Sequence, residues 1–262
     1  MMNRADDFKD IARHYDHIMD HVDYDRWFLV VTQLAKLLPK QRRHLDAACG
    51  TGTLLKMLRR AGWSSIGVDL SIAMLRTGKK GGGCPLPAAV ADLRAMPFKG
   101  SVALVTCLFD SMNFLLDMAD FSCALRAFHG ALSPDGILYF DVVTERMVFD
   151  HYEGQSWVED NGRFSTTWEN DYDRRTGVIV TRIHANTGAA CRLRERVYHR
   201  EEIEQAVAQA GFHILGVHDA RSWKAPNRKS IRLDFVAAKG NAKPLQGPFR
   251  EIREEIRQWL SG

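Results

Sequence analysis

The chain has 262 residues, of which 45% are hydrophobic and 26% charged, with a formal net charge of +4. This composition is typical of one globular unit or of a domain carrying an insertion, and it excludes a largely disordered chain. The positive charge is too small and too scattered to indicate a nucleic-acid-binding surface by itself.

The first 150 residues predict a helical segment and then alternating strands and helices. Apolar residues recur at helical spacing from residue 8 to 38, and Pro39 ends this pattern. Five buried strands are predicted in HLDAAC, SSIGVDL, AAVADL, VALVTCLF and GILYFDVV. Helices are expected from Leu54 to Arg60, in IAMLRTGKK behind a Ser71 cap, and in FSCALRAFHGAL before an SPDG turn. Strands separated by single helices predict a parallel sheet of right-handed βαβ units.

The composition changes after residue 150, where Thr, Val, Trp and Tyr become frequent. SWVED, RFSTTWENDYD, VIVTRIHAN and RLRERVYH are separated by the turn signals NG, RRTG and NTG, which predicts an antiparallel meander. REEIEQAVAQAGF predicts a helix, HILGVHDA and IRLDFVAAK a strand pair, and FREIREEIRQWL a final amphipathic helix. The expected fold is α/β, with a doubly wound, mostly parallel seven-stranded sheet and an inserted antiparallel meander.

The distribution of apolar residues and cysteines indicates a cytoplasmic protein. No apolar run approaches the roughly 20 residues of a membrane span, and the charged start MMNRADDFKDIARHYD does not resemble a signal peptide. The five cysteines form no C-x-x-C pair, which favours reduced thiols over disulfides or a zinc site. The three histidines of HYDHIMDH lack the H-E-x-x-H pattern, so a solvated helix face is expected there and no metal.

The stretch HLDAACGTGTLL holds two glycines just after the first predicted strand. Glycine lets a backbone approach a ligand where a side chain would collide, and open parallel sheets bind ligands at the carboxyl ends of their strands. Asp69, Asp92 and Asp110 all follow such ends. Asp69 lies roughly 20 residues beyond Gly50, the spacing at which a second strand delivers an acid to ribose hydroxyls.

These features fit either NAD or S-adenosylmethionine (SAM). The dinucleotide fingerprint G-x-G-x-x-G needs a third glycine where this sequence has Leu55, and no P-loop Gly-Lys-Ser/Thr follows. Asp92 is also placed to accept a hydrogen bond from an adenine amino group. An adenosine ligand without phosphates therefore fits better, and NAD stays open as the alternative.

Five segments occur in the order and at the spacing of the motifs of class I SAM-dependent methyltransferases. They are LDAACGTGTLL, GVDLSIAML, VADLRAMPF, VALVTCLFDSMNFL and LSPDGILYFDVV, between about residues 44 and 143. The chain resembles this family, and its last strand pair resembles the hairpin that ends the Rossmann-like methyltransferase fold. ARHYDHIMDHVDYDRW and the meander resemble the small-molecule branch that includes sugar-amine N,N-dimethyltransferases. The resemblance implies SAM as the cofactor and S-adenosylhomocysteine as the product.

The resemblance also implies a cofactor site. Asp46 would orient the ammonium of SAM, Asp69 would bind the ribose diol, and Asp92 would accept from the adenine amine. Tyr15 and Trp27 match the aromatic positions that close over SAM, where a ring face attracts a sulfonium. The full expected set is Tyr15, Trp27, Asp46, Ala48, Cys49, Gly50, Gly52, Asp69, Leu70, Met74, Asp92, Leu93, Leu108 and Phe109. Tight turns, helix caps and helix packing are the structural alternatives at these positions.

A small molecule, most simply an amine, is the expected methyl acceptor. An amine needs only its free-base form, while a hydroxyl usually needs a base or a metal. Asp110, Tyr172 and His199 are the candidate catalytic bases if one assists. A nucleic-acid substrate is not expected, because the Pro-Cys pair of cytosine-C5 enzymes and the [DN]PP[YF] tetrad are both absent. An RNA methyltransferase and a non-catalytic binding protein stay open as alternatives.

Four parts are expected along the chain. Residues 1–40 form a helical lid segment, and residues 41–150 form the SAM-binding core. Residues 151–200 form the inserted sheet, as a substrate wall, and residues 201–262 complete the core fold. In the resembling sugar enzymes such an insertion also joins subunits, so a homodimer is an expectation here.

Overall fold

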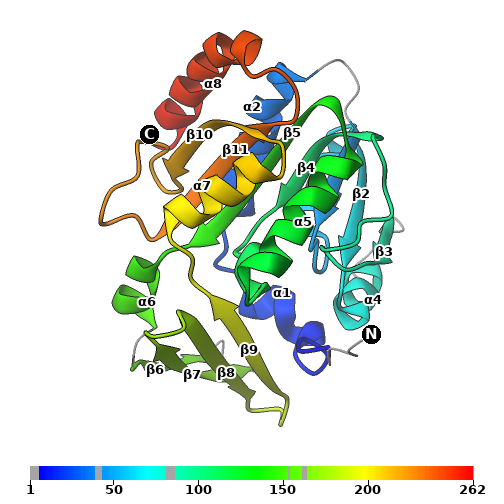
Figure 1. Cartoon of the computed structure of the whole chain (residues 1–262). Coiled ribbons are helices and arrows are strands. Elements are labelled where there is room, and N and C mark those ends of the chain that lie inside the picture. The colour runs from blue at the N-terminus through cyan, green and yellow to red at the C-terminus, as the bar shows by residue number, and fades with distance from the viewer. Residues whose placement is uncertain (1–5, 39–42, 81–85, 153, 161–163, 262) are drawn as a thin grey trace.

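Two β-sheets organise the chain (Figure 1). The computed structural model describes residues 6–38, 43–80, 86–152, 154–160 and 164–261. A seven-stranded sheet has the order β10-β11-β5-β4-β1-β2-β3, and a four-stranded sheet has the order β6-β7-β8-β9. The predicted α/β class with an inserted meander is confirmed. The expected helix stop at Pro39, the glycine loop at 81–83 and the turn at 161–162 lie outside the described residues.

The large sheet is parallel except for β11. Its strands are β1 (Arg43–Ala47), β2 (Ser64–Asp69), β3 (Ala88–Val90), β4 (Val102–Cys107), β5 (Leu132–Val143), β10 (His213–Asp219) and β11 (Arg232–Ala238). β11 runs antiparallel to both β5 and β10. The chain proceeds from β1 outward to β3 and then returns to β4 on the other side of β1. The carboxyl ends of β1 and β4 therefore flank the switch point at which such sheets bind ligands.

One predicted turn is absorbed into this sheet. β5 begins at Leu132, so the SPDG segment lies inside the strand rather than before it. The β4–β5 register shifts there, between the pairs Val102–Leu132 and Leu104–Ile137. The turn residues thus form an irregularity of an otherwise continuous strand.

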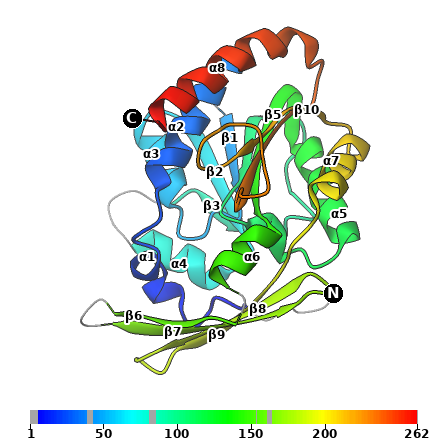
Figure 2. The same cartoon turned by 90° about the vertical axis from the view of Figure 1, so that its left-hand side faces the viewer.

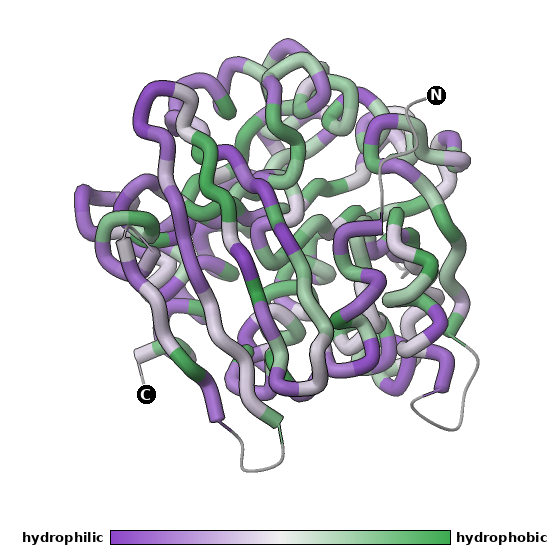
Figure 3. Tube along the Cα trace, turned by 90° about the horizontal axis from the view of Figure 1, so that it is seen from below, coloured by the Kyte–Doolittle hydropathy of each residue, from purple (hydrophilic) through white to green (hydrophobic). Residues whose placement is uncertain are grey.

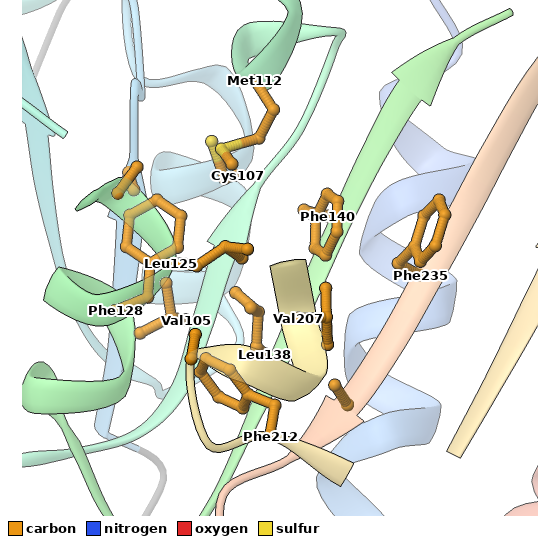
Figure 4. Packing of buried hydrophobic residues seen from close by; sticks show 14 of the residues in the cluster. Val105, Cys107, Met112, Leu125, Phe128, Leu138, Phe140, Val207, Phe212 and Phe235 are labelled. Carbon is orange, nitrogen blue, oxygen red and sulfur yellow. The ribbon is translucent and has the colours of Figure 1, made fainter. Parts of the chain in front are cut away.

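Helices cover both faces of the large sheet, as a doubly wound fold requires. α5 (Met118–Ala131) and α7 (Arg200–Gln209) pack on one face, and α2 (Tyr24–Leu34), α3 (Thr53–Arg60) and α8 (Gln246–Trp259) on the other. Because side chains alternate along a strand, β5 sends Phe140 to the first layer and Tyr139 to the second. Figure 4 shows the first layer, in which the rings of Phe140 and Phe235 stack with centroids 4.9 Å apart.

α4 (Ile72–Lys80) supports the glycine turn that follows β1. Its first turn is capped as predicted, since the Met74 backbone N–H donates to Ser71 Oγ at 3.1 Å. Its later residue Gly78 touches the turn itself, where an added Cβ would lie 2.8 Å from the Thr51 carbonyl carbon. Glycine is therefore required at position 78 by the close approach of two backbones.

Gly78→Ala is expected to lower the free energy of unfolding by about 1–3 kcal/mol, because backbone atoms cannot yield as a flexible side chain would. Gly130→Ala in α5 is the matched control, since a Cβ there meets nothing within 4 Å. That change should leave stability unaltered or raise it by roughly 0.5–1 kcal/mol. Urea unfolding of both variants measures the difference, and equal midpoints would contradict the close packing of α4.

The second sheet consists of β6 (Ser156–Asp160), β7 (Ser165–Asp173), β8 (Val178–Ala185) and β9 (Ala190–Arg196), all antiparallel. It follows α6 (Glu145–His151), a helix that the sequence analysis did not predict. Figure 2 shows the sheet beneath α1 (Tyr15–Ile18) and α6, at one end of the large sheet. Polar and apolar residues alternate along its strands (Figure 3), so that Ile183 is buried while Glu169 is exposed.

None of the helices in the described part of the chain has both the length and the apolar character to cross a membrane.

Candidate active site

A cavity of about 1360 Å³ lies where the carboxyl edge of the large sheet meets the N-terminal segment and the second sheet. All of the predicted cofactor residues line it except Gly52. Gly52 is the N-cap of α3 with φ 78°, and an added Cβ would lie 2.5 Å from Leu86 Cδ1. Position 52 therefore requires glycine because of its left-handed backbone and its packing against Leu86, and not because it faces the cavity.

The carboxylate of Asp69 fixes the conformation of the turn that follows β1. Ala48 and Gly50 both have left-handed backbones, with φ of 59° and 57°. Asp69 at the end of β2 accepts hydrogen bonds from the Gly50 and Ser71 backbone N–H groups, both at 2.8 Å. Burial raises the pKa of Asp69 above its ordinary value, while these two bonds oppose the rise. Asp69 therefore fixes the ends of β1 and β2 and faces the cavity between them.

Asp46 brings a buried carboxyl group to the floor of the cavity. It accepts a hydrogen bond from Thr106 Oγ1 at 2.7 Å. Burial raises the pKa of Asp46 to about 7, and the nearby Asp69 charge adds to the rise. No basic side chain of the described residues pairs with Asp46. A cationic group of a ligand would stabilise its ionised form.

Asp92 lies at the rim of the cavity, two residues beyond β3. Arg94 holds its carboxylate with Nε and Nη2 at 2.9 and 2.6 Å, and the same guanidinium contacts Asp120 at 2.8 Å. Leu70 and Val90 line the same cavity and are each about half exposed. The rim thus combines an apolar surface with a carboxylate already engaged by an arginine.

The N-terminal segment closes one side of the cavity. Asp16 accepts a hydrogen bond from Thr51 Oγ1 of the glycine turn, and Asp6 accepts one from the Ala73 backbone N–H at 3.3 Å. Tyr15 lines the cavity, and burial, then the neighbouring Tyr24, Asp110 and Asp69, raise its pKa well above the ordinary value. The Tyr15 side chain therefore lies near both the β2 and the β4 carboxylates.

The turn after β4 is backbone-strained. Phe109 and Asp110 have φ of 57° and 52°, a region in which non-glycine residues cost roughly 1–3 kcal/mol each. Asp141 of β5 compensates, because its carboxylate accepts the backbone N–H groups of Asp110 at 2.6 Å and Phe109 at 3.2 Å. It also accepts Trp27 Nε1 at 3.1 Å, so the N-terminal helix α2 is tied to the same carboxylate.

A buried arginine completes this cluster. Arg232 of β11 donates to Asp141 Oδ1 at 2.9 Å and to Asp110 Oδ2 at 3.1 Å. The β5–β11 register sets Asp141 directly opposite Asp234, and Arg26 pairs with Asp234 in the same way. The buried carboxylates of β5 and β11, Asp141 and Asp234, thus each have a guanidinium partner, as burial of charge requires.

Of the three candidate bases, only Asp110 lines the cavity. Tyr172 packs against Phe149 of α6, and its hydroxyl donates to Glu145 at 2.9 Å. His199 forms a capping box with Glu202 at the start of α7. Neither side chain borders the cavity. Tyr172 is held by α6, the helix that was not predicted, and His199 caps the first turn of α7.

One histidine of the N-terminal segment differs from the expected solvated face, whereas His17 and His21 are exposed. His14 is not simply solvated, because its ring stacks on Phe164 with centroids 4.4 Å apart, and His17 contacts the same ring edge-on. Within the described ranges, no group of three or more His, Cys, Asp or Glu residues could hold a metal ion.

Three charged residues that line or support the cavity were not predicted from the sequence: Asp141, Arg232 and Glu195. Each stands inside a strand pattern, in FDVV, IRLDF and RLRER, where a charged residue occupies an inward-facing position. A carboxylate or guanidinium at an inward position of a strand is the signal that could have found them.

The fold and this cavity define an α/β enzyme that binds an adenosyl ligand at the switch point of its sheet. Residues 45–136 match the methyltransferase domain family. The dTDP-3-amino-3,6-dideoxy-alpha-D-glucopyranose N,N-dimethyltransferase of Streptomyces fradiae is 30% identical over 235 residues, covering 80% of this chain and 87% of the relative. A Bacillus subtilis (strain 168) protein assigned as a methyltransferase, YqeM, is 27% identical over 242 residues, covering 88% and 97%.

A solved S-adenosylmethionine-dependent methyltransferase from Clostridium acetobutylicum ATCC 824 has the same fold. It superposes with a TM-score of 0.77 at 23% identity, covering 87% of this chain and 96% of that one. The chain belongs to the class I SAM-dependent methyltransferases.

SAM is accordingly the cofactor, and the residues of the cavity fit it. A Cβ on Gly50 would lie 3.3 Å from Met74 Cε, and both residues line the cavity. A side chain at position 50 would therefore fill the space beside the backbone that glycine leaves to a ligand. Asp46 would offer its buried carboxyl group, which no basic side chain of the described residues pairs, to the ammonium, and Asp69 would accept from the ribose. The ring of Tyr15 suits the sulfonium.

SAM affinity is expected to fall as the pH drops below 7. With its pKa at about 7 in the free protein, Asp46 must release a proton before it can pair with the ammonium of SAM. Each pH unit below that value should therefore weaken binding by up to about tenfold. Calorimetric titration between pH 5.5 and 7.5 measures this slope. Asp46→Asn should bind more weakly at pH 7.5 and lose the slope, so an equal slope in this variant would contradict the assignment.

Proposed function

We propose that this enzyme transfers the methyl group of SAM to the amino group of a small molecule. The observation that carries the proposal is the half of the cavity beyond Tyr15, whose walls come from α6 and the second sheet. Trp157 and Trp168 stack there with centroids 5.5 Å apart, and the carboxyl group of Glu195 lines the same wall. Aromatic faces and carboxylates together complement an amine or its cation. The Streptomyces fradiae relative is named for action on an amino sugar.

The chain's own contribution to the reaction is mainly positional. SAM supplies a methyl carbon bound to a cationic sulfur, which makes the leaving group good without further protonation. The nitrogen of the acceptor must be in its free-base form and lie about 3–3.5 Å from that carbon, in line with the sulfur. Asp110, at the strained turn after β4, is the candidate base that borders the cavity, and Arg232 fixes its carboxylate.

The N-terminal segment is proposed as the lid and the second sheet as the acceptor wall. The bonds of Asp6 and Asp16 to α4 and to the glycine turn support the first role. The stacking of His14 on Phe164 joins this segment to the second sheet. Movement of the lid would therefore open both halves of the cavity together.

Formation of S-adenosylhomocysteine with matched acceptors tests the proposal. Glucosamine and glucose form one pair, and benzylamine and benzyl alcohol another, so that size is constant while the amine is replaced. Turnover with amines alone is expected. Turnover with the alcohols alone, or with RNA in a reaction that added salt suppresses, would overturn the proposal in favour of O-methylation or an RNA substrate.

A further inference from the structure

We propose that Glu195 is the residue that selects the acceptor in its ammonium form, by pairing its carboxylate with that group when the acceptor binds. Asp110, the candidate base that borders the cavity, then takes the proton, so that the nitrogen reacts as the free base. This inference rests on the proposed amine methyltransfer and adds to it the charge state of the acceptor and the residue that recognises it.

Glu195 occupies an inward position of β9. Along this strand Cys191, Leu193 and Glu195 are buried, whereas Arg192 and Arg194 between them are exposed. Glu195 therefore occupies a buried position of the alternating pattern of β9, at which an apolar residue is expected. Its side chain lines the cavity although the residue is only 8% exposed.

The carboxylate of Glu195 has no partner in the described part of the chain, neither a hydrogen bond nor an ion pair. Glutamates are almost never this buried unless they are paired. The two guanidinium groups of the neighbouring buried cluster are already engaged, Arg232 by Asp110 and Asp141, and Arg26 by Asp234. Only the cavity is left to provide a partner for Glu195.

Charge balance around Glu195 identifies the missing partner as a cation. The groups that face it are Asp110 from the turn after β4, Arg232 from β11 and Tyr152 after α6, with Asp141 of β5 behind Arg232. Three carboxyl groups thus share one guanidinium. Burial, and then the Asp110 charge, raise the pKa of Glu195 well above its ordinary value, and Arg232 offsets this only in part. An ammonium beside Glu195 would supply the missing positive charge and favour its ionised form.

The aromatic wall of the same half-cavity suits such a ligand. Trp157 and Trp168 stack at an interplanar angle of 7°, and both belong to the inner face of the second sheet, as Glu195 does. Tyr152, which faces Glu195, stacks on Trp157 with centroids 6.4 Å apart, so the aromatic rings extend from this wall toward the carboxylate. An ammonium held by the carboxylate can also gain from an aromatic face. A neutral alcohol of the same shape would not stabilise the ionised form of Glu195 and would gain no such pairing.

Binding of 4-fluorobenzylamine and of 4-fluorobenzyl alcohol, followed by fluorine NMR, tests the inference. The protein is saturated with S-adenosylhomocysteine, so that the probes cannot occupy the cofactor half. The wild type is expected to bind the amine at least tenfold more tightly than the alcohol, and Glu195→Gln to bind both alike. Glu195→Asp should restore part of the preference. Glu169→Gln, on the outer face of β7, is the matched control and should behave as wild type.

The pH dependence separates recognition by charge from a structural role. Because the pKa of Glu195 is raised, affinity of the wild type for the amine should rise with pH as Glu195 loses its proton, and Glu195→Gln should show no such rise. Preserved preference in Glu195→Gln, or no preference in the wild type, would overturn the inference. If the enzyme methylates amines while Glu195→Gln keeps the preference, the inference alone fails. Turnover with alcohols alone would instead remove the proposed function itself.

Discussion

Asp141→Asn is expected to lower the melting temperature by roughly 6–20 °C and to abolish methyl transfer. Asp141 accepts four hydrogen bonds, from the backbone N–H groups of Phe109 and Asp110, from Trp27 and from Arg232. In Asp141→Asn, the NH2 group of the new amide would face N–H groups that are themselves donors. The Arg232 charge would also lose its ionised partner. Breaking a buried ion pair costs about 3–5 kcal/mol, and each kcal/mol corresponds to about 2–4 °C for a chain of this size.

The loss of activity has a separate cause from the loss of stability. Without Asp141, the left-handed turn at Phe109 and Asp110 has no carboxylate to hold it, and both of these residues line the cavity. Asp135→Asn is the matched control, because Asp135 lies on the same strand and is exposed. Calorimetry and the rate of S-adenosylhomocysteine formation measure both effects. A variant that melts within 2 °C of the wild type would show that this cluster does not stabilise the fold.

Asp69→Asn is expected to weaken SAM binding by about 100-fold or more. Both oxygens of Asp69 accept backbone N–H groups, from Gly50 and Ser71 at 2.8 Å. An amide nitrogen would face one of these donors, so the glycine turn would shift, and the ribose would lose a charged acceptor. Hydrogen bonds to charged groups contribute about 1.5–3 kcal/mol each, and about 2.7 kcal/mol corresponds to 100-fold in affinity.

Thermal unfolding with and without SAM measures this loss. At about a hundred times its dissociation constant SAM stabilises the folded state by ~2.7 kcal/mol, which is roughly 5–10 °C here. At the same SAM concentration Asp69→Asn should show almost no shift. Asp20→Asn, exposed in the N-terminal segment, should respond as the wild type does. An equal shift for Asp69→Asn would remove Asp69 from the cofactor site.

The order and type of the main elements could be predicted because their signals are local. Buried strands appear as short apolar runs, the helices between them show helical spacing, and the Ser71 cap lies one residue before its helix. The glycine turn and Asp69 could also be placed, since a βαβ unit fixes the distance between the ends of its strands. The short helix Glu145–His151 escaped prediction because it spans only about two turns.

The sequence by itself therefore determined the doubly wound sheet and, apart from Gly52, a set of residues that line the cavity. Only the tertiary structure decided which residues of the strands β5, β9 and β11 join them. Asp141, Glu195 and Arg232 come from strands in two different sheets, and no local spacing connects them. Their meeting depends on the β5–β11 register and on how the second sheet folds back over the carboxyl edge of the first. Those contacts are set by packing between distant segments, which leaves no periodic trace in the sequence.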